Sequence, residues 1–248
     1  MDKVVRASDA AVADMRSGAT VMLGGFGLCG IPENLIAALV RRGRLAGEAR
    51  LSELHTISND MGVGGFGMGL MLEAGMIASH TGSYLGENHL LEKQVLAGKL
   101  DLRLVPQGTL AERIRAAGAG IAAFYVATGL GTMVAEGKET REIDGRRYVM
   151  EHPLHADFAL VKAWKGDRHG NLVYRKTARN FNPVMATAAE VTIAEVEELV
   201  EPGELDPERI GTPGIYVQRV VKGEEYRRLI EPRYLKAQAE AAAGRGGR

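Results

Sequence analysis

The stretch "VMLGGFGLCGIPENL" (residues 21–35) carries four glycines, at positions 24, 25, 27 and 30, directly after a short apolar run. Glycine loses more conformational freedom on folding than any other residue, so this concentration needs a structural reason. Residues 20–23 have the composition of a short buried strand, and Pro32 suits the first turn of a helix, where its missing N–H is not needed. The stretch therefore predicts a strand, a glycine loop and a helix in succession.

The same alternation continues along the chain and predicts an α/β protein. Helices are expected at 7–18, 32–42, 86–98, 109–120 and 182–190, with Thr109 and Glu112 spaced as a capping box, and a short helix followed by a strand is expected within 71–82. Further strands are expected at 49–58, 100–105, 122–128, 157–164, 191–199 and 214–221.

These elements predict an open, mainly parallel sheet with helices on both faces, plus hairpin additions in the second half. The hairpins are expected at Asp144-Gly145 and at the turn 167–171. No segment has the composition of an interdomain linker. Residues 1–235 are therefore expected to form a single domain, and 236–248 a flexible C-terminal tail.

The glycine loop supports two interpretations. "GFGLCG" satisfies G-x-G-x-x-G, so its backbone N–H groups and the following helix N-terminus are candidates for cradling a phosphate, as in an NAD-dependent Rossmann oxidoreductase. The acidic residue that binds ribose should then follow about 20 residues later; Asp60 lies 30 residues past Gly30. The alternative is that the glycines only permit tight turns.

Composition excludes several other classes. The chain has 31 basic and 31 acidic residues in 248, so nothing points to nucleic acid or to an anionic membrane as a partner. A single cysteine excludes an internal disulfide, and the six histidines lack metal-ligand spacing, so no metal is expected. No apolar run approaches the length of a signal peptide core or of a membrane span, and a cytoplasmic protein is expected.

A wider resemblance narrows the choice. "GGFGLCGIPENLI", "SNDMGVGGFGMGLML", "SYLGEN", "PQGTLAERIRAAGAGIAAFY", "DFALVKAWKGDRHGNLVYRKTARNFNP" and "TPGIYVQRVV" resemble, in order, the α subunit of class I coenzyme A transferases, and most closely the succinyl-CoA:3-ketoacid branch. The resemblance runs from about Val4 to Val221. It implies transfer of CoA from succinyl-CoA to acetoacetate or a close 3-oxoacid. The 3-oxoadipate and acetate types are the alternatives within the family, and a non-catalytic binding partner is another.

The resemblance also implies a division of labour between two chains. In the family, a glutamate of the β subunit reacts with the acyl-CoA thioester and forms covalent intermediates, in a Ser-Glu-Asn-Gly motif that this chain lacks. A partner β subunit, within an α2β2 heterotetramer, is therefore expected. CoA and acyl-CoA are expected as substrates, with no permanently bound cofactor. Glu87 of "GEN" is interpreted as an acid in the first turn of the helix that starts there, or as an echo of that motif near the interface.

Candidate site residues follow from the same resemblance. Gln107 ends the strand 100–105, where ligands of open α/β sheets bind, and an amide there can donate to a developing oxyanion; the alternative is a buried glutamine bonded to backbone groups. Asn59 occupies the equivalent place after its own strand. Cys29 is more simply interpreted as a small packing residue, and the basic run 174–181 as a solvated face or as a contact with CoA phosphates or the partner. The residues expected to bind CoA are Gly24, Gly25, Phe26, Gly27, Leu28, Cys29 and Gly30.

Overall fold

The computed structural model of the chain describes residues 2–228. The predicted tail, 236–248, and the end of the predicted domain lie outside the described residues.

One main sheet organises the molecule, in the strand order β11-β10-β8-β1-β2-β3-β4. Every neighbouring pair in this order is parallel, and β9 joins β8 in the antiparallel sense, so the predicted mainly parallel sheet is confirmed. β1 lies near the centre of the sheet, because Met22 pairs with Ile57 on one side and with Ala159 on the other. The strands are β1 (Thr20–Leu23), β2 (Leu54–Ile57), β3 (Ile77–Gly82), β4 (Asp101–Leu104), β8 (Ala156–Asp167), β9 (Leu172–Val173), β10 (Ala189–Val200) and β11 (Arg219–Lys222).

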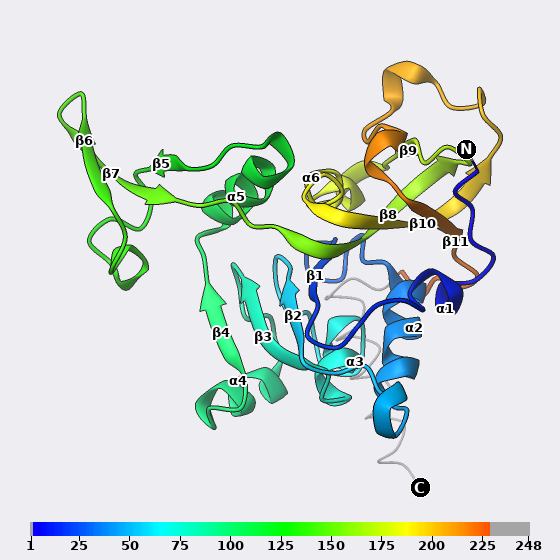
Figure 1. The fold of residues 1–248 in the computed structure, drawn as a ribbon, viewed down its shortest axis with the longest axis horizontal. Coiled ribbons are helices and arrows are strands. Elements are labelled where there is room, and N and C mark those ends of the chain that lie inside the picture. Colours follow the sequence, from blue (N-terminus) through cyan, green and yellow to red (C-terminus); the bar gives the residue numbers. More distant parts are fainter. Residues whose placement is uncertain (1, 229–248) are drawn as a thin grey trace, which may run out of the picture.

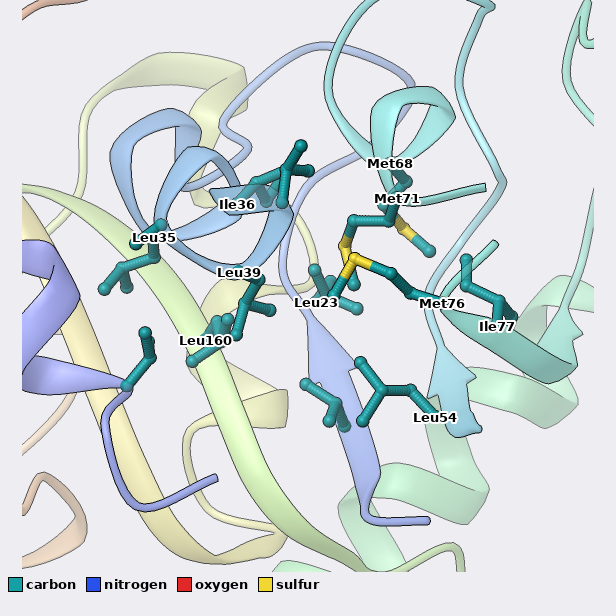
Figure 2. Close-up of a cluster of buried hydrophobic side chains, with 14 of the residues drawn as sticks. Leu23, Leu35, Ile36, Leu39, Leu54, Met68, Met71, Met76, Ile77 and Leu160 are labelled. Atoms are coloured by element: carbon teal, nitrogen blue, oxygen red, sulfur yellow. The ribbon is translucent and has the colours of Figure 1, made fainter. Parts of the chain in front are cut away.

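Helices cover both faces of this sheet, as predicted (Figure 1). Side chains alternate along a strand, so Leu23 packs on one face and Met22 on the other. The face that holds Leu23 packs against α1 to α4, and Figure 2 shows Leu35, Ile36 and Leu39 of α2 on this side. The opposite face packs against α5 and α6. The helices are α1 (Ser8–Ala11), α2 (Glu33–Gly43), α3 (Met68–Glu73), α4 (His89–Leu96), α5 (Gln107–Ala119) and α6 (Asn182–Met185).

A small antiparallel sheet stands apart from the main one (Figure 1). It has the order β5-β7-β6 and consists of β5 (Phe124–Val126), β6 (Thr140–Ile143) and β7 (Arg146–Glu151). Asp144 and Gly145 join β6 to β7 with φ values of 50° and 75°, the left-handed conformation that this tight hairpin turn requires. The predicted hairpin is confirmed, and the strand expected at 122–128 belongs to this sheet.

Three helix predictions need correction. α5 begins at Gln107 after Pro106, which places Thr109 inside the helix and buries it at 3% exposure, so the capping box is wrong. The helix expected at 7–18 is the single turn α1, and the one expected at 182–190 is the short α6. Both sequences are rich in alanine, which fits a helix but also fits the close packing of loops against a sheet. Tertiary packing overrides helix propensity here.

Candidate active site at the carboxyl ends of β1 to β4

The loops that follow four neighbouring parallel strands meet at one edge of the main sheet. A cavity of about 430 Å³ opens between them. The carboxyl ends of parallel strands are where open α/β sheets bind ligands. The lining residues are Phe26, Gly27, Asn59, Asp60, Gly62, Val63, Ser83, Tyr84, Gly86, Glu87 and Gln107. The structure thus brings the glycine loop, Asn59, Gln107 and Glu87 to one place.

Asn59 is the centre of a hydrogen-bond network in the floor of this cavity. It is 2% exposed, and its Oδ1 accepts hydrogen bonds from Gln107 Nε2 at 2.9 Å and from Ser83 Oγ at 3.0 Å. Its Nδ2 donates to Asp60 Oδ2 at 2.7 Å. A buried amide with these partners is held in one orientation. Asn59 therefore positions Gln107.

Gln107 is exposed, so the alternative of a buried glutamine is wrong. It is the first residue of α5, directly after the loop that leaves β4. One of its amide N–H groups donates to Asn59, which leaves the second N–H directed outside this network. A neutral donor is thus available at the cavity wall.

Asp60 fixes the glycine loop to the end of β2. Its side chain is buried, Oδ2 accepts from the N–H of Gly27 at 2.7 Å, and Oδ1 accepts from the N–H of Gly62 at 2.7 Å. With Asn59 also donating to it, the carboxylate is committed to the protein. Asp60 is therefore an organising residue and not the ribose-binding acid of a dinucleotide site.

The glycine loop folds back on itself as a tight hairpin. The N–H of Phe26 donates to the carbonyl of Cys29 at 3.0 Å, and the N–H of Cys29 donates to the carbonyl of Phe26 at 3.0 Å. Gly25 and Gly30 have φ values of 128° and 75°, which other residues adopt at a cost. A Cβ on Gly30 would lie 2.7 Å from the carbonyl oxygen of Ala178. Turn geometry and close packing account for these glycines.

Two asparagines brace the outer side of the loop. Asn182 is fully buried; its Nδ2 donates to the carbonyls of Gly30 and Ala178, each at 3.0 Å, and its Oδ1 accepts from the N–H of Lys162 at 2.8 Å. Asn180 donates to the carbonyl of Cys29 at 2.9 Å. Sequence reasoning misses both roles, because "NFNP" has no periodicity and its partners in the loop lie about 150 residues earlier.

A remote carboxylate occupies the start of α2. Pro32 precedes the helix and makes no side-chain cap, and the backbone N–H groups of Asn34 and Leu35 donate to Glu195 Oε2, each at 2.9 Å. Glu195 lies on β10 with no exposed surface, and this burial raises its pKa to about 7. The helix N-terminus is already occupied, so the predicted phosphate cradle of a dinucleotide site is wrong.

A signal for Glu195 exists in the sequence. It stands between Ala194 and Val196 in an otherwise apolar stretch of strand, and a charged residue inside such a run has to find buried partners. Pattern reading alone does not identify those partners.

Glu87 lies outside α4, which corrects the prediction of a first-turn acid. Asn88 caps that helix, and its Oδ1 accepts from the N–H groups of Leu90 at 3.2 Å and Leu91 at 3.3 Å. The acid in the first turn is Glu92. Glu87 precedes the cap, is exposed and lines the cavity with Gln107.

Other site types are not found in the part of the chain that the structure describes. Residues 2–228 contain no group of three histidine, cysteine or acidic side chains placed to hold a metal ion. Within the same residues, no helix has the length and apolar character needed to cross a membrane. Cys29 is half-buried, and its Sγ lies 3.4 Å from Thr177 Oγ1.

Known proteins identify the family. Residues 5–223 match the Coenzyme A transferase family. The chain is 51% identical, over 99% of both chains, to the α subunit of a probable succinyl-CoA:3-ketoacid coenzyme A transferase of Bacillus subtilis. It is 49% identical to the corresponding α subunit of Helicobacter pylori, over 93% of this chain and 97% of that one.

A solved structure supports the fold. An acyl-CoA transferase of Escherichia coli O157:H7, in a thioester complex with CoA, superposes with a TM-score of 0.81 at 20% identity, over 93% of this chain and 49% of that one. The chain thus spans about half the length of that transferase. The matching family and the near full-length identity lead to one conclusion: this chain belongs to the coenzyme A transferase family.

Proposed function

We propose that the chain is the α subunit of a succinyl-CoA:3-ketoacid CoA transferase, which moves CoA from succinyl-CoA to acetoacetate or a close 3-oxoacid. The observation that carries this proposal is the identity of 51% over 99% of both chains to a relative that bears this name. The cavity at the carboxyl ends of β1 to β4 supports it, since that is where such a reaction would take place on this fold.

The proposed chemistry divides the work between this chain and a partner β subunit. A glutamate of the partner attacks the thioester carbonyl and forms a covalent intermediate, which splits the acyl exchange into easier steps. The free N–H of Gln107 is placed to donate to the oxygen on which charge develops, and Asn59 holds Gln107 for that purpose. Asn59 itself acts as a positioning residue.

The glycine loop contributes to CoA binding through side chains more than through its backbone. The N–H groups of residues 24, 26, 27 and 29 donate to protein atoms, and the Phe26 side chain is 48% exposed at the cavity. An exposed aromatic ring there suits contact with the pantetheine arm or with the partner chain. Tyr84, 59% exposed on the same cavity, extends this surface.

Two finer points belong to the same proposal. The assembly is an α2β2 heterotetramer, in keeping with relatives that are each named as one subunit of a transferase. The 3-oxoadipate and acetate types remain the alternatives for the acceptor. A panel of acetate, acetoacetate and 3-oxoadipate as acceptors, assayed with the assembled enzyme and succinyl-CoA, decides among them.

The decisive experiment separates the two chains. The purified chain alone should show no exchange between succinyl-CoA and acetoacetate, and adding the β subunit should restore it. Trapping the enzyme thioester with borohydride or hydroxylamine and mapping the peptide should place the label on a glutamate of the partner. Full activity of this chain by itself, or a label on Glu87, would overturn the proposal. Glu87→Gln should retain the covalent step.

A further inference from the structure

A second cavity lies against the other part of the glycine loop. It measures about 310 Å³, and Leu28, Cys29, Gly30 and Ile31 form one wall, whereas Phe26 and Gly27 face the cavity with Gln107. The opposite walls come from residues 162–164 of β8 and from residues 174–178. The two cavities therefore share the loop as a common wall.

Positive side chains dominate this second cavity. Lys162, Arg175, Lys176 and Arg228 line it, against the two carboxylates of Glu33 and Glu197. Four cations and two anions leave a formal excess of two positive charges (4 − 2). The four cations come from separate parts of the chain, so this excess is a product of the fold and not of one basic run.

One carboxylate serves three of these cations. Glu197 lies 2.5 Å from Lys162, 2.9 Å from Arg228 and 3.9 Å from Arg175. The Lys162 side chain is only 9% exposed, so its ammonium is a fixed charge at the base of the cavity. A single carboxylate cannot satisfy all the donors of three cations. The remaining N–H groups favour an incoming anion.

Lys176 completes the set. Within residues 2–228 no hydrogen bond or ion pair of its ammonium is found, and its backbone is left-handed, with a φ of 52°. A lysine in this conformation is uncommon, and such residues cluster at functional sites.

We propose that this cavity binds phosphate groups of a nucleotide, and that in the working enzyme these belong to the nucleotide end of the CoA thioester. The second clause rests on the proposed transferase function, whereas the first does not. Lys and Arg clusters with unused donors are the side chains that recognise phosphate. The shared loop would let one extended ligand contact both cavities, with the thioester near Gln107 and the phosphates near Lys176.

The kinetic test compares a substrate with phosphates and one without. The double variant Arg175→Gln/Lys176→Gln removes two exposed cations, and Lys99→Gln is the control, an exposed lysine outside both cavities. With the β subunit present, the double variant should raise KM for succinyl-CoA by roughly three- to tenfold, the range expected for lost hydrogen bonds to charged groups. KM for succinyl-pantetheine, which lacks the nucleotide, should stay within error of the wild type.

The binding test does not depend on transferase activity. Adenosine 3′,5′-bisphosphate is titrated calorimetrically into the full chain, with and without the β subunit. Binding that weakens in the double variant but not in Lys99→Gln supports the phosphate site, even if no partner restores exchange. If binding weakens while KM for succinyl-CoA does not change, the site stands, but its ligand is a free nucleotide and the CoA assignment fails.

Two results would overturn the proposal. One is the absence of binding by the wild-type chain at millimolar bisphosphate, with KM unaffected by the double variant. The other is loss of binding when the β subunit is added, since the cavity would then be part of the interface between the two chains.

Discussion

Gln107 Nε2 lies 2.9 Å from Asn59 Oδ1, although the two residues are 48 positions apart in the sequence. One is the first residue of α5 and the other follows β2 closely. Parallel strands bring their carboxyl ends to one edge, and this places the two amides in contact. Because Asn59 holds the side chain that faces the cavity, the two residues are expected to act as a unit.

Gln107→Ala should lower kcat/KM with little effect on the melting temperature, since Gln107 is exposed. Removal of a single oxyanion donor typically lowers the rate about 10²–10³-fold. Asn59→Ala should lower kcat/KM as well, and the double variant should lose less than the product of the two single effects, because both changes remove the same donor geometry. Multiplicative effects in this cycle would show that the two amides work independently.

Gly30→Ala and Gly120→Ala form a matched pair for the loop. Their φ values are 75° and 68°, so both substitutions carry a left-handed penalty of about 1 kcal/mol. The Cβ at position 30 meets the carbonyl of Ala178 at 2.7 Å, whereas at position 120 it meets nothing within 4 Å. Gly30→Ala should therefore lower stability and exchange activity clearly more than Gly120→Ala, as measured by urea unfolding and by turnover. Equal losses would refute a packing role for Gly30.

Gly24 and Asn182 should show a size exchange. A Cβ on Gly24 would overlap the side-chain amide of Asn182. Gly24→Ala should therefore destabilise the wild-type protein strongly, and Asn182→Ala should destabilise it by about 1–3 kcal/mol, because buried backbone groups lose their partners. In the Asn182→Ala background, adding Gly24→Ala should cause a smaller loss than it does in the wild type. Thermal unfolding of the four proteins tests this, and additive losses would contradict it.

The buried Glu195 predicts a specific pH dependence. Burial raises its pKa to about 7 in the folded chain, above the value near 4.3 of an unfolded glutamate. Between these values the folded state binds the extra proton, so the contribution of Glu195 to stability is present at acidic pH and falls as pH rises towards 7. Glu195→Gln lacks this titration. Denaturant unfolding at pH 5 and pH 8 should therefore show the wild type losing stability relative to Glu195→Gln on going to pH 8, and a constant difference would contradict the shift.

Much of the fold follows from the sequence, because its signals are local. The apolar run before Gly24 predicts β1, and Asp144-Gly145 predicts the hairpin from β6 to β7. Where the sequence is alanine-rich and the pattern weak, as around Thr109 and in 182–190, the predicted helix boundaries are wrong. Tertiary packing sets those boundaries, and no local pattern contains it.

The site divides along the same line. Positions after predicted strands, such as Asn59 and Gln107, are predictable because the rule concerns the ends of strands. The roles of Asp60 and Asn182 are not, because they are defined by hydrogen bonds to a loop that lies 33 and 152 positions earlier. The G-x-G-x-x-G pattern misleads for the same reason, since the residue that occupies the α2 N-terminus is on β10.

The cap that Glu195 supplies to α2 has a consequence for biosynthesis. On a ribosome that makes about 5–20 residues per second, α2 emerges well before the residue that completes its first turn, which lies 160 positions later. β1 likewise waits for its partner β8. The amino-terminal half thus leaves the ribosome with an unfinished sheet edge, and the native arrangement closes only when β10 has been translated. Such long-range closure slows folding, and truncated chains that end before β10 are expected to depend on chaperones.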